Sequence, residues 1–526
     1  MKSPIPMKLR FVFFYFLSAL FFGLSVQSCK KDRQPDLTYD TSPSTGTRTE
    51  LTLDSIYLYA RQIYLWNDQL PTYDNFDPRK YNSLSGSVFR KLSQELFDIT
   101  QIPRNPATGE SYEFANSSSP KYSYISDDGG GNGIVATFRS DVSLEGLGDD
   151  FGFKVAVAED QNNNRFLFIR SVETDSPADE AGLKRGYRIT RINNANVDLS
   201  TTTGLNNIDN AMQRAQIKVE GQRNDAGGTS FNNTVSRGFY SANPIYLNKV
   251  IDYAGKKVGY LAYARFSNLG NSESVLNEAF QQFTAAGVTD LILDFRYNGG
   301  GYVSTAEHMM NLISPTSLNG KTMFIEHYND IMRSGKAIIL KNQFFESNGK
   351  TYSYFDYPFD EKSNTSTFEK AGALNTVKNV YFIVSGNTAS ASELVINSLK
   401  PYLNVKLIGT TTYGKPVGFF PITIDNWEVY LTSFESRNAN NEGRYYAGMK
   451  PNVETFDDVT KDFGDPAENC LAKTLALVGG TSPTSVGTKM SIGGKTLSAS
   501  GIKIEPRGTE SEFKGMIEDR IKLKKK

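Results

Sequence analysis

The spacing of hydrophobic positions changes twice along the chain. Residues 51–102 carry helical spacing, most clearly at 56–64 and 88–97, whereas residues 122–243 alternate in the manner of strands, most clearly at 151–157 and 165–169. From residue 245 to 477, short strand patterns alternate with helical ones. This order predicts a multidomain α+β protein. We expect a helical N-terminal domain at 51–121, a β domain at 122–244 and an α/β core with parallel strands at 245–478.

Two stretches lack a strong pattern. Residues 198–235 are polar and rich in Gly and Asn, which predicts long loops within the β domain. Residues 479–526 are rich in Gly, Ser and Thr and then in Lys, which predicts a C-terminal tail with a solvated lysine end. One alternating piece of this tail, residues 488–504, predicts a small hairpin.

The N-terminus has the features of a secretory signal. A basic start is followed by an apolar run at residues 11–26, which is shorter than the roughly 20 residues of a membrane-spanning helix. The run ends in Val26-Gln27-Ser28-Cys29, which resembles the lipobox of bacterial lipoproteins, although Gln27 is unusual there. The resemblance implies a lipid on Cys29, a membrane anchor and a location in the cell envelope. The alternatives to a lipid-anchored protein are an ordinary cleaved signal and an apolar segment that itself anchors the chain in the membrane. The polar residues 30–50 predict a flexible tether.

Composition narrows the possible partners. Lys+Arg and Asp+Glu both number 57, so nothing indicates a nucleic-acid partner. If Cys29 carries a lipid, only Cys470 remains, which excludes an intrachain disulfide. We expect Cys470 to be a small buried side chain on a helix. The sequence has no cluster of His, Cys and Asp with metal-ligand spacing, so we expect neither a metal nor another cofactor.

The candidate chemistry centres on Ser390. It lies in a run of small residues that enters an apolar helical pattern, and Lys415 follows 25 positions later. A serine nucleophile needs a neighbouring base, yet the only histidines, His308 and His327, have no catalytic context and His308 fits a structural role. A buried lysine is therefore the most plausible base.

A second serine and lysine pair has the spacing of another dyad. Ser347 and Lys350 fit Ser-x-x-Lys, but that dyad needs a helix, whereas the intervening Asn-Gly predicts a turn. We therefore exclude this pair.

Three motifs resemble those of the C-terminal processing peptidases, which are serine peptidases with a Ser-Lys dyad. The motifs are Asp294-Phe295-Arg296-Tyr297-Asn298-Gly299-Gly300-Gly301, Thr388-Ala389-Ser390-Ala391-Ser392-Glu393 and Gly414-Lys415. The resemblance implies a ClpP/crotonase-like core with Ser390 as nucleophile and Lys415 as general base. It also implies protein or peptide substrates held by their C-terminal ends.

The β domain resembles a PDZ domain. Residues 176–189 are similar to its short helix and following strand, and Phe151-Gly152-Phe153 is similar to its carboxylate-binding loop. In such a loop, backbone N–H groups bind a chain terminus while the peptide adds as a strand to the sheet edge.

Elementary chemistry is consistent with these roles. At a helix N-terminus, Ser390 faces N–H groups and the positive end of the helix dipole, which favour a developing negative charge. The N–H of Ala391 and one from Gly300 or Gly301 could form an oxyanion hole. Burial of Lys415 would lower its pKa and let it accept a proton.

One position departs from the family pattern. The family's glutamine four residues after the lysine is Phe419 here, and Pro416 replaces a common glycine. Phenylalanine cannot hydrogen-bond the amine, although it could help to desolvate it. The first hypothesis is a lipid-anchored serine endopeptidase. The alternatives are a catalytically inactive PDZ-containing peptide-binding lipoprotein and an acyl hydrolase acting on non-peptide substrates.

Overall fold

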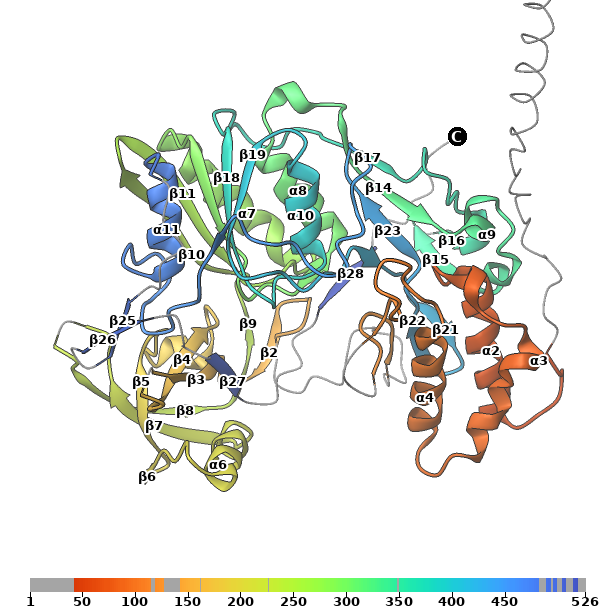
Figure 1. The fold of residues 1–526 in the computed structure, drawn as a ribbon, viewed down its shortest axis with the longest axis horizontal. Coiled ribbons are helices and arrows are strands. Elements are labelled where there is room, and N and C mark those ends of the chain that lie inside the picture. The colour runs from red at the N-terminus through yellow and green to blue at the C-terminus, as the bar shows by residue number, and fades with distance from the viewer. Residues whose placement is uncertain are drawn as a thin grey trace, which may run out of the picture. The chain divides into compact units, whose positions relative to one another are not determined.

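The computed structural model describes residues 42–114, 119–126, 142–160, 162–225, 227–347, 350–481, 489–492, 495–498, 504–507 and 514–518 (Figure 1). The described residues from Pro43 onward form one compact unit. The predicted signal segment, Cys29 and the terminal lysines lie outside the described residues. Within the described part, no helix has both the length and the hydropathy that a membrane crossing requires.

Both predicted helices of the N-terminal region are confirmed. Helix α2 (Arg48–Ile63) begins three residues before the expected boundary at Leu51, because Thr47 and Glu50 form a capping box there. Helix α4 (Val88–Gln101) is capped by Ser87 and buries Leu92 and Leu96. The elements between them are short: η1 (Asn67–Gln69), α3 (Tyr73–Phe76) and η2 (Pro78–Ser83).

The strand-rich region is built on a seven-stranded sheet. Its main path runs β27-β3-β4-β5-β7-β8, and β6 pairs with β5. The strands are β3 (Phe153–Glu159), β4 (Arg165–Val172), β5 (Arg188–Ile192), β6 (Ala195–Asn196), β7 (Gln216–Gln222), β8 (Ser230–Ser236) and β27 (Ile504–Arg507). Two further strands, β2 (Leu147–Asp150) and β9 (Gly238–Ser241), form an antiparallel pair. The short helix predicted after Ser176 is α5 (Pro177–Glu180).

The prediction of long loops at 198–235 was wrong. This stretch contains β7, β8 and helix α6 (Thr202–Met212), which is capped by Thr201. Helix α6 buries Ile208 and Ala211, which lie three positions apart on one face. Most residues of this stretch are polar, so the short apolar pattern could not be recognised in the sequence.

The core sheet has the predicted parallel strands. Its order is β10-β11-β12-β18-β19-β24, and only β10 is antiparallel to its neighbour. The strands are β10 (Ile245–Tyr253), β11 (Lys256–Tyr263), β12 (Asp290–Asp294), β18 (Asn379–Val384), β19 (Asn404–Gly409) and β24 (Val453–Glu454).

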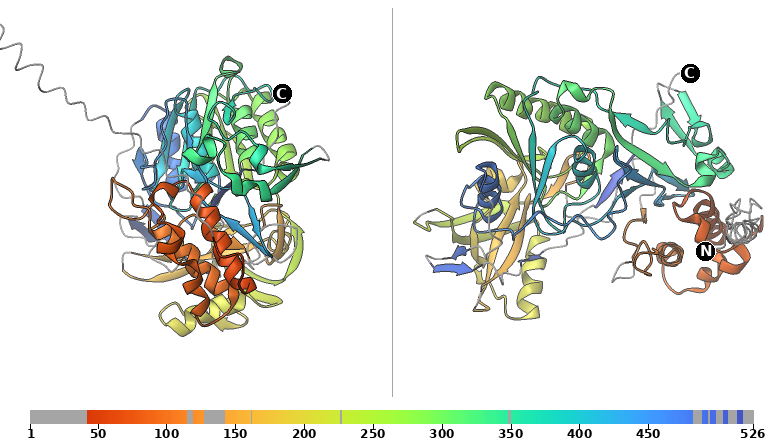
Figure 2. Two further views of the ribbon diagram at one scale, coloured as in Figure 1. Left: turned by 90° about the vertical axis from the view of Figure 1, so that its right-hand side faces the viewer. Right: turned by 45° about the horizontal axis from the view of Figure 1, so that its top comes forward.

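Helices cover both faces of this sheet. One cluster of buried side chains joins it to α7 (Leu269–Ala285), α8 (Val303–Ile313) and α10 (Ala391–Leu399), which pack near one another in Figures 1 and 2. A second cluster joins the opposite face to α11 (Asn469–Val478) and includes Cys470. The prediction of a buried Cys470 on a helix is confirmed, because its exposed fraction is 2%.

Smaller sheets complete the molecule. A four-stranded sheet contains β17 (Thr365–Thr367), β14 (Thr322–Tyr328), β23 (Phe434–Arg437) and β20 (Val417–Gly418). A three-stranded sheet contains β1 (Tyr124–Ser126), β22 (Trp427–Tyr430) and β21 (Ile422–Ile424). The two-stranded pairs are β13 (Gly300–Tyr302) with β28 (Gly515–Ile517), β15 (Phe344–Ser347) with β16 (Lys350–Ser353), and β25 (Lys489–Ile492) with β26 (Lys495–Ser498).

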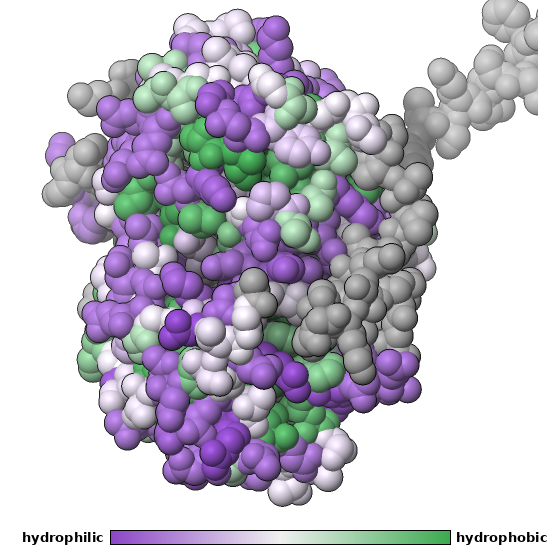
Figure 3. Space-filling view, turned by 90° about the vertical axis from the view of Figure 1, so that its left-hand side faces the viewer, coloured by the Kyte–Doolittle hydropathy of each residue, from purple (hydrophilic) through white to green (hydrophobic). Residues whose placement is uncertain are grey.

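The pair β25 and β26 confirms the predicted hairpin. Short helical pieces lie in the chain between helix α8 and strand β17: η3 (Thr316–Leu318), α9 (Asp330–Arg333), η4 (Ile338–Asn342) and η5 (Tyr354–Asp356). The face seen in Figure 3 is mostly hydrophilic, with hydrophobic side chains in separate patches.

Three neighbouring parallel strands bring the candidate motifs together. The glycine run follows the end of β12, Ser390 follows the end of β18, and Lys415 follows the end of β19. In a parallel sheet these ends lie at one edge, where α/β proteins place their sites.

Candidate active site

Ser390 sits at a sharp entry into α10. It is the N-cap residue, its φ and ψ are 58° and −109°, and its exposed fraction is 0%. Such a backbone conformation costs a non-glycine residue on the order of 1–3 kcal/mol and is typical of functional sites. Its Oγ is buried without a hydrogen-bond partner among the described residues.

The carboxylate of Glu393 ties the serine segment to the lysine segment. Its Oε2 accepts the backbone N–H of Ser390 at 2.9 Å and that of Lys415 at 2.8 Å. Its Oε1 accepts the Gly414 N–H at 2.9 Å and the Thr412 hydroxyl at 2.5 Å. Burial raises the pKa of Glu393, and these hydrogen bonds partly oppose that rise. Four donors on one carboxylate fix the relative position of the two segments.

The amine of Lys415 is buried and held by carbonyl groups. The side chain is 1% exposed, and Nζ donates to Lys514 O at 2.8 Å and to Tyr122 O at 3.4 Å. Burial lowers the pKa of Lys415 to about 7, although the charges of Glu113 and Glu393 act against this shift. An amine with this pKa exists partly in its neutral form at neutral pH.

Phe419 lies against the lysine in place of the family's glutamine. The amine of Lys415 is 4.4 Å from the centre of the Phe419 ring, and Phe419 is fully buried. The ring helps to desolvate the amine and also attracts its charged form. The hydrogen bonds that a glutamine would supply come instead from two backbone carbonyls. Sequence reasoning missed both, because neither Tyr122 nor Lys514 is near Lys415 in the chain.

The glycine run is held against the start of α10 by Asn298. Its carbonyl accepts the Ala389 N–H at 3.1 Å and the Ser392 hydroxyl at 3.0 Å. Its side chain accepts the N–H of Gly300 at 2.9 Å. Of the two glycines expected to supply an oxyanion donor, Gly300 is thus engaged, which favours Gly301. The φ values of Gly300 and Gly301 are 109° and 138°, which require glycine.

Ala391 is close to this loop. A Cβ added to Gly300 would lie 3.0 Å from Ala391 N. Ala391 is the first residue of α10, so its N–H has no acceptor within the helix. The structure therefore brings Ala391 and the glycine run together, as predicted.

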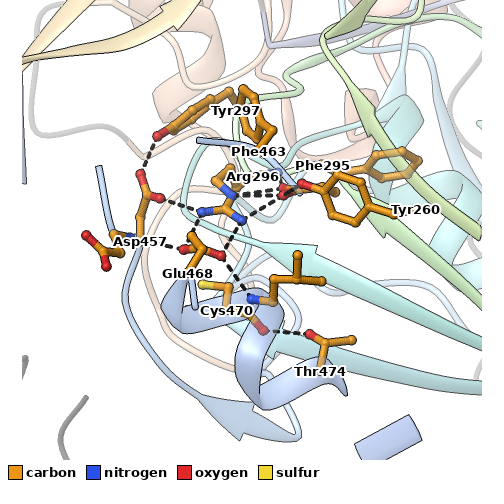
Figure 4. A network of polar contacts seen from close by, with 12 residues as sticks. Tyr260, Phe295, Arg296, Tyr297, Asp457, Phe463, Glu468, Cys470 and Thr474 are labelled. Atoms are coloured by element: carbon orange, nitrogen blue, oxygen red, sulfur yellow. Dashed lines mark hydrogen bonds and ion pairs between the residues drawn. The ribbon is translucent and has the colours of Figure 1, made fainter. Parts of the chain in front are cut away.

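A buried network follows directly after β12 (Figure 4). The Arg296 guanidinium donates to Asp294 Oδ2 at 2.7 Å, to Glu468 Oε1 at 2.8 Å and to Asp457. Tyr297 also donates its hydroxyl to Asp457. Burial alone would raise the pKa of Asp457, but nearby arginine charges hold it well below its usual value.

The same network reaches the strand-rich region through Arg185. Its guanidinium donates to Tyr297 Oη and to Asp457 Oδ1, each at 2.6 Å, and to the carbonyl of Arg170 at 2.6 Å. The side chain of Arg185 is 1% exposed. This residue follows the short helix α5 and links that region to the strand end that carries the glycine run.

The predicted carboxylate-binding loop precedes β3. Phe151 and Phe153 are 1% and 3% exposed and belong to the hydrophobic core of the sheet. Gly152 has φ 77°, and its N–H donates to Asp150 Oδ1 at 2.7 Å. If a peptide carboxylate bound this backbone amide, it would displace the carboxylate of Asp150.

The other candidate residues lie outside this arrangement. His308 pairs with Asn277 Oδ1 at 2.9 Å, in line with a structural role. Ser347 and Lys350 face each other across the hairpin of β15 and β16, so they do not share a helix. Within the described segments, no group of three or more His, Cys, Asp or Glu residues is arranged to hold a metal ion.

Comparison with known proteins identifies two regions of the chain. Residues 257–455 match the model of peptidase family S41, and residues 141–220 match that of the PDZ domain. Residues 257–455 therefore form a domain of peptidase family S41. Both PDZ motifs quoted above lie within the matched residues.

Individual relatives are distant. The chain is 26% identical over 388 residues to a probable CtpA-like serine protease of Staphylococcus aureus (strain N315), covering 72% of this chain and 65% of that protein. It is 25% identical over 313 residues to the carboxy-terminal processing protease CtpA of Bacillus subtilis (strain 168), covering 59% and 56%. The chain spans about half to two thirds of the length of the curated relatives it matches.

One solved structure supports the fold. The crystal structure of a candidate S41 protease from Bacteroides fragilis NCTC 9343 is similar, with a TM-score of 0.56 and 22% identity. The match covers 84% of this chain and 98% of that one. The likeness concerns the arrangement of the elements.

Proposed function

We propose that this chain is a serine endopeptidase with Ser390 as nucleophile and Lys415 as general base. The observation that carries the proposal is the buried amine of Lys415, whose pKa is about 7. The backbone of Lys415 and that of Ser390 are bound to one oxygen of Glu393. A base with a pKa near the working pH is the most effective one for proton transfer.

The reaction then follows from the residues around Ser390. The neutral amine of Lys415 accepts the Oγ proton as Ser390 attacks a peptide carbonyl. The N–H groups of Ala391 and Gly301 stabilise the oxyanion. The lysine returns the proton to the leaving amine, and water hydrolyses the acyl-enzyme.

We infer that the substrates are proteins or peptides recognised near their C-terminal ends. A PDZ domain binds an extended segment by adding it to a sheet edge. The name of the Bacillus subtilis relative refers to carboxy-terminal processing. Strand β3 follows the candidate loop Phe151-Gly152-Phe153, and it is the strand to which we expect such a segment to add.

We also propose that the protein is a lipoprotein of the cell envelope, anchored in the membrane through Cys29. The support is the basic and apolar start that ends at the lipobox-like Cys29. Mass spectrometry of the mature N-terminus and detergent partitioning of wild type and Cys29→Ser test this. A Cys29→Ser variant that stays in the detergent phase would contradict the anchor.

Cleavage of an unfolded protein tests the enzymatic function. We expect wild type to cleave casein and Ser390→Ala, Lys415→Ala and Lys415→Arg to lose at least about 10³-fold in kcat/KM. Arginine keeps the charge but does not give up its proton, so it cannot act as the base. Equal activity in all four proteins would rule out the assignment of Ser390 as nucleophile and Lys415 as base.

A peptide-binding lipoprotein without turnover is the second candidate. The full burial of Ser390 favours it, because a buried hydroxyl is not open to substrate in this arrangement. Labelling with a fluorophosphonate probe separates the two functions. A protein that only binds peptides shows no labelling that depends on Ser390.

A further inference from the structure

The last part of the chain adds a strand to the PDZ domain. Strand β27 pairs antiparallel with β3, with Ile504 opposite Ala158 and Arg507 opposite Val155. It forms the edge of the sheet beside β3, and it runs toward the loop that precedes Phe153. Addition of an extended segment to a sheet edge is how PDZ domains hold peptides. The edge expected to bind substrate is therefore occupied by the chain itself (Figure 1).

A second strand of the same tail lies in the candidate active site. Strand β28 pairs in parallel with β13, and Gly515 N donates to Gly299 O at 3.1 Å. On its other side, Phe419 N donates to Met516 O at 3.4 Å and Glu518 N donates to Phe419 O at 3.2 Å. The strand is thus held between the glycine run and the segment that follows Lys415.

The side chains of this strand are enclosed. Met516 is fully buried, and Ile517 is 6% exposed and packs in a cluster with Leu144, Phe419 and Tyr430. Apolar side chains in pockets beside a backbone-paired strand are the usual means by which a peptide groove selects its sequence.

The register places one carbonyl group at the expected oxyanion site. On its other edge, β13 bonds to Phe266 through Gly300 O and Tyr302 N, so the N–H of Gly301 faces β28. In a parallel ladder whose Gly515 N donates to Gly299 O, that N–H faces the carbonyl oxygen of Gly515.

The position of Ala391 agrees with this assignment. The point that a Gly300 Cβ would occupy lies 2.3 Å from Gly515 O and 3.0 Å from Ala391 N. The neighbouring carbonyl, that of Lys514, accepts a hydrogen bond from Lys415 Nζ at 2.8 Å. Both proposed oxyanion donors and the proposed base therefore surround the backbone at residues 514 and 515.

We propose that the chain is its own substrate and that Ser390 cleaves the Gly515–Met516 peptide bond. This inference rests on the proposed peptidase function. The Ser390 oxygen bonds to the carbonyl carbon of Gly515, and its proton moves to the neutral amine of Lys415. The bond from that carbon to Met516 N breaks as the lysine returns the proton to this nitrogen. Water then hydrolyses the ester, which leaves a chain ending at Gly515 and a peptide of residues 516–526.

The proposal accounts for the burial of the site. Ser390 and Lys415 are 0% and 1% exposed while the tail is in place. Release of residues 516–526 frees the contacts that Phe419 makes with Met516 and Glu518. The site between the glycine run and Phe419 that held Met516 and Ile517 is then open to other chains.

Intact-mass spectrometry of the purified full chain tests the cleavage. The mass is measured at once and during incubation at a pH above the pKa of Lys415, alongside Ser390→Ala. We expect wild type to lose residues 516–526 and Ser390→Ala to keep its full mass. Ile517→Asp introduces a charge at a buried position and should slow the loss at least about tenfold, whereas Lys524→Asp, beyond the strand, should not.

Parallel assays on casein separate this inference from the proposed function. If wild type cleaves casein through Ser390 but keeps its own C-terminus, or loses it at another bond, the self-cleavage is wrong and the peptidase stands. Loss of the tail at equal rates in wild type and Ser390→Ala assigns the cut to another enzyme and also overturns it. If neither casein nor the tail is cut, both proposals fail. Thermal melting confirms that each variant is folded.

Discussion

Ser390 and Lys415 are bound to the same oxygen atom, because the backbone N–H of each donates to Glu393 Oε2. The two residues come from segments that follow neighbouring strands, and neither segment has regular structure at that point. The shared buried acceptor therefore takes the place of the regular backbone hydrogen bonds of a helix or a sheet. It fixes two backbones relative to each other.

Replacement of this acceptor should damage both stability and activity. In Glu393→Gln the amide NH₂ must face N–H or O–H donors, which leaves buried groups unpaired. We expect the free energy of unfolding to fall by about 2–4 kcal/mol and kcat to fall by about 10–100-fold. Urea denaturation and casein cleavage measure the two effects. A variant with wild-type stability would show that the shared acceptor does not fix the two segments.

The activity should depend on the ionisation of Lys415. Its pKa is about 7, and only the neutral amine accepts the Ser390 proton. We therefore expect kcat/KM to rise with pH, to reach half of its maximum near pH 7 and to level off above that. A profile that stays flat from about pH 6 to 9 would exclude this lysine as the base.

Removal of the buried amine should stabilise the fold while abolishing the reaction. The pKa of Lys415 is lowered in the folded state, so around neutral pH the folded state binds fewer protons than the unfolded state. The stability of the fold therefore increases as pH rises from about 7 toward the pKa of this lysine in the unfolded state. Lys415→Met avoids the cost of burying the amine. We expect about 1–3 kcal/mol more stability near pH 7 and no casein cleavage. A lower melting temperature would indicate that the two carbonyl contacts outweigh the cost of burial.

Phe419 should set the pKa of the lysine beneath it. Leucine is apolar as well and still shields the amine from water, but it lacks the ring that attracts the charged form. Phe419→Leu should therefore lower the pKa of Lys415 and move the rise in kcat/KM about 0.5–1 unit toward acid. Phe420→Leu is the matched control, because Phe420 is equally buried but stacks on Tyr354 instead. A shift of the same size in both variants would point to general loosening of the core.

Periodic elements were predictable because each carries its own pattern. Helix α4 and strand β18 have enough apolar positions at one spacing to identify them. Helix α6 was missed because only a few apolar residues in a Gly- and Asn-rich stretch form its buried face. Strands β27 and β28 were missed as well, because each spans only three or four residues, too few to show a periodic pattern.

The candidate site was likewise predictable only in part. Ser390, Lys415 and the glycine run were identified from their residue types and spacing. The groups that hold the lysine amine are carbonyls of Tyr122 and Lys514, and every residue has a carbonyl, so no sequence pattern could indicate them. The role of Asn298 had a faint signal, since it directly precedes the glycines that it binds.

The network in Figure 4 should make stability depend on pH through Asp457. The charges of Arg185 and Arg296 hold its pKa below the unfolded value of 3.8, so its contribution to stability is complete above about pH 4 and is lost as pH falls toward the lower folded value. Asp457→Asn leaves two buried guanidinium groups short of an acceptor. We expect a loss of about 3–5 kcal/mol near neutral pH.

The comparison across pH distinguishes this ion pair from ordinary packing. Below about pH 4, the carboxylate of Asp457 binds a proton in the unfolded wild type but stays charged in the folded state. Each further pH unit should therefore reduce the difference in unfolding free energy between the two proteins by about 1.4 kcal/mol. Denaturant titrations at neutral pH and at about pH 3 measure the difference. If it is the same at both, the carboxylate acts through its shape rather than its charge, and the link between Arg185 of the PDZ domain and the strand end at Arg296 is not an electrostatic one.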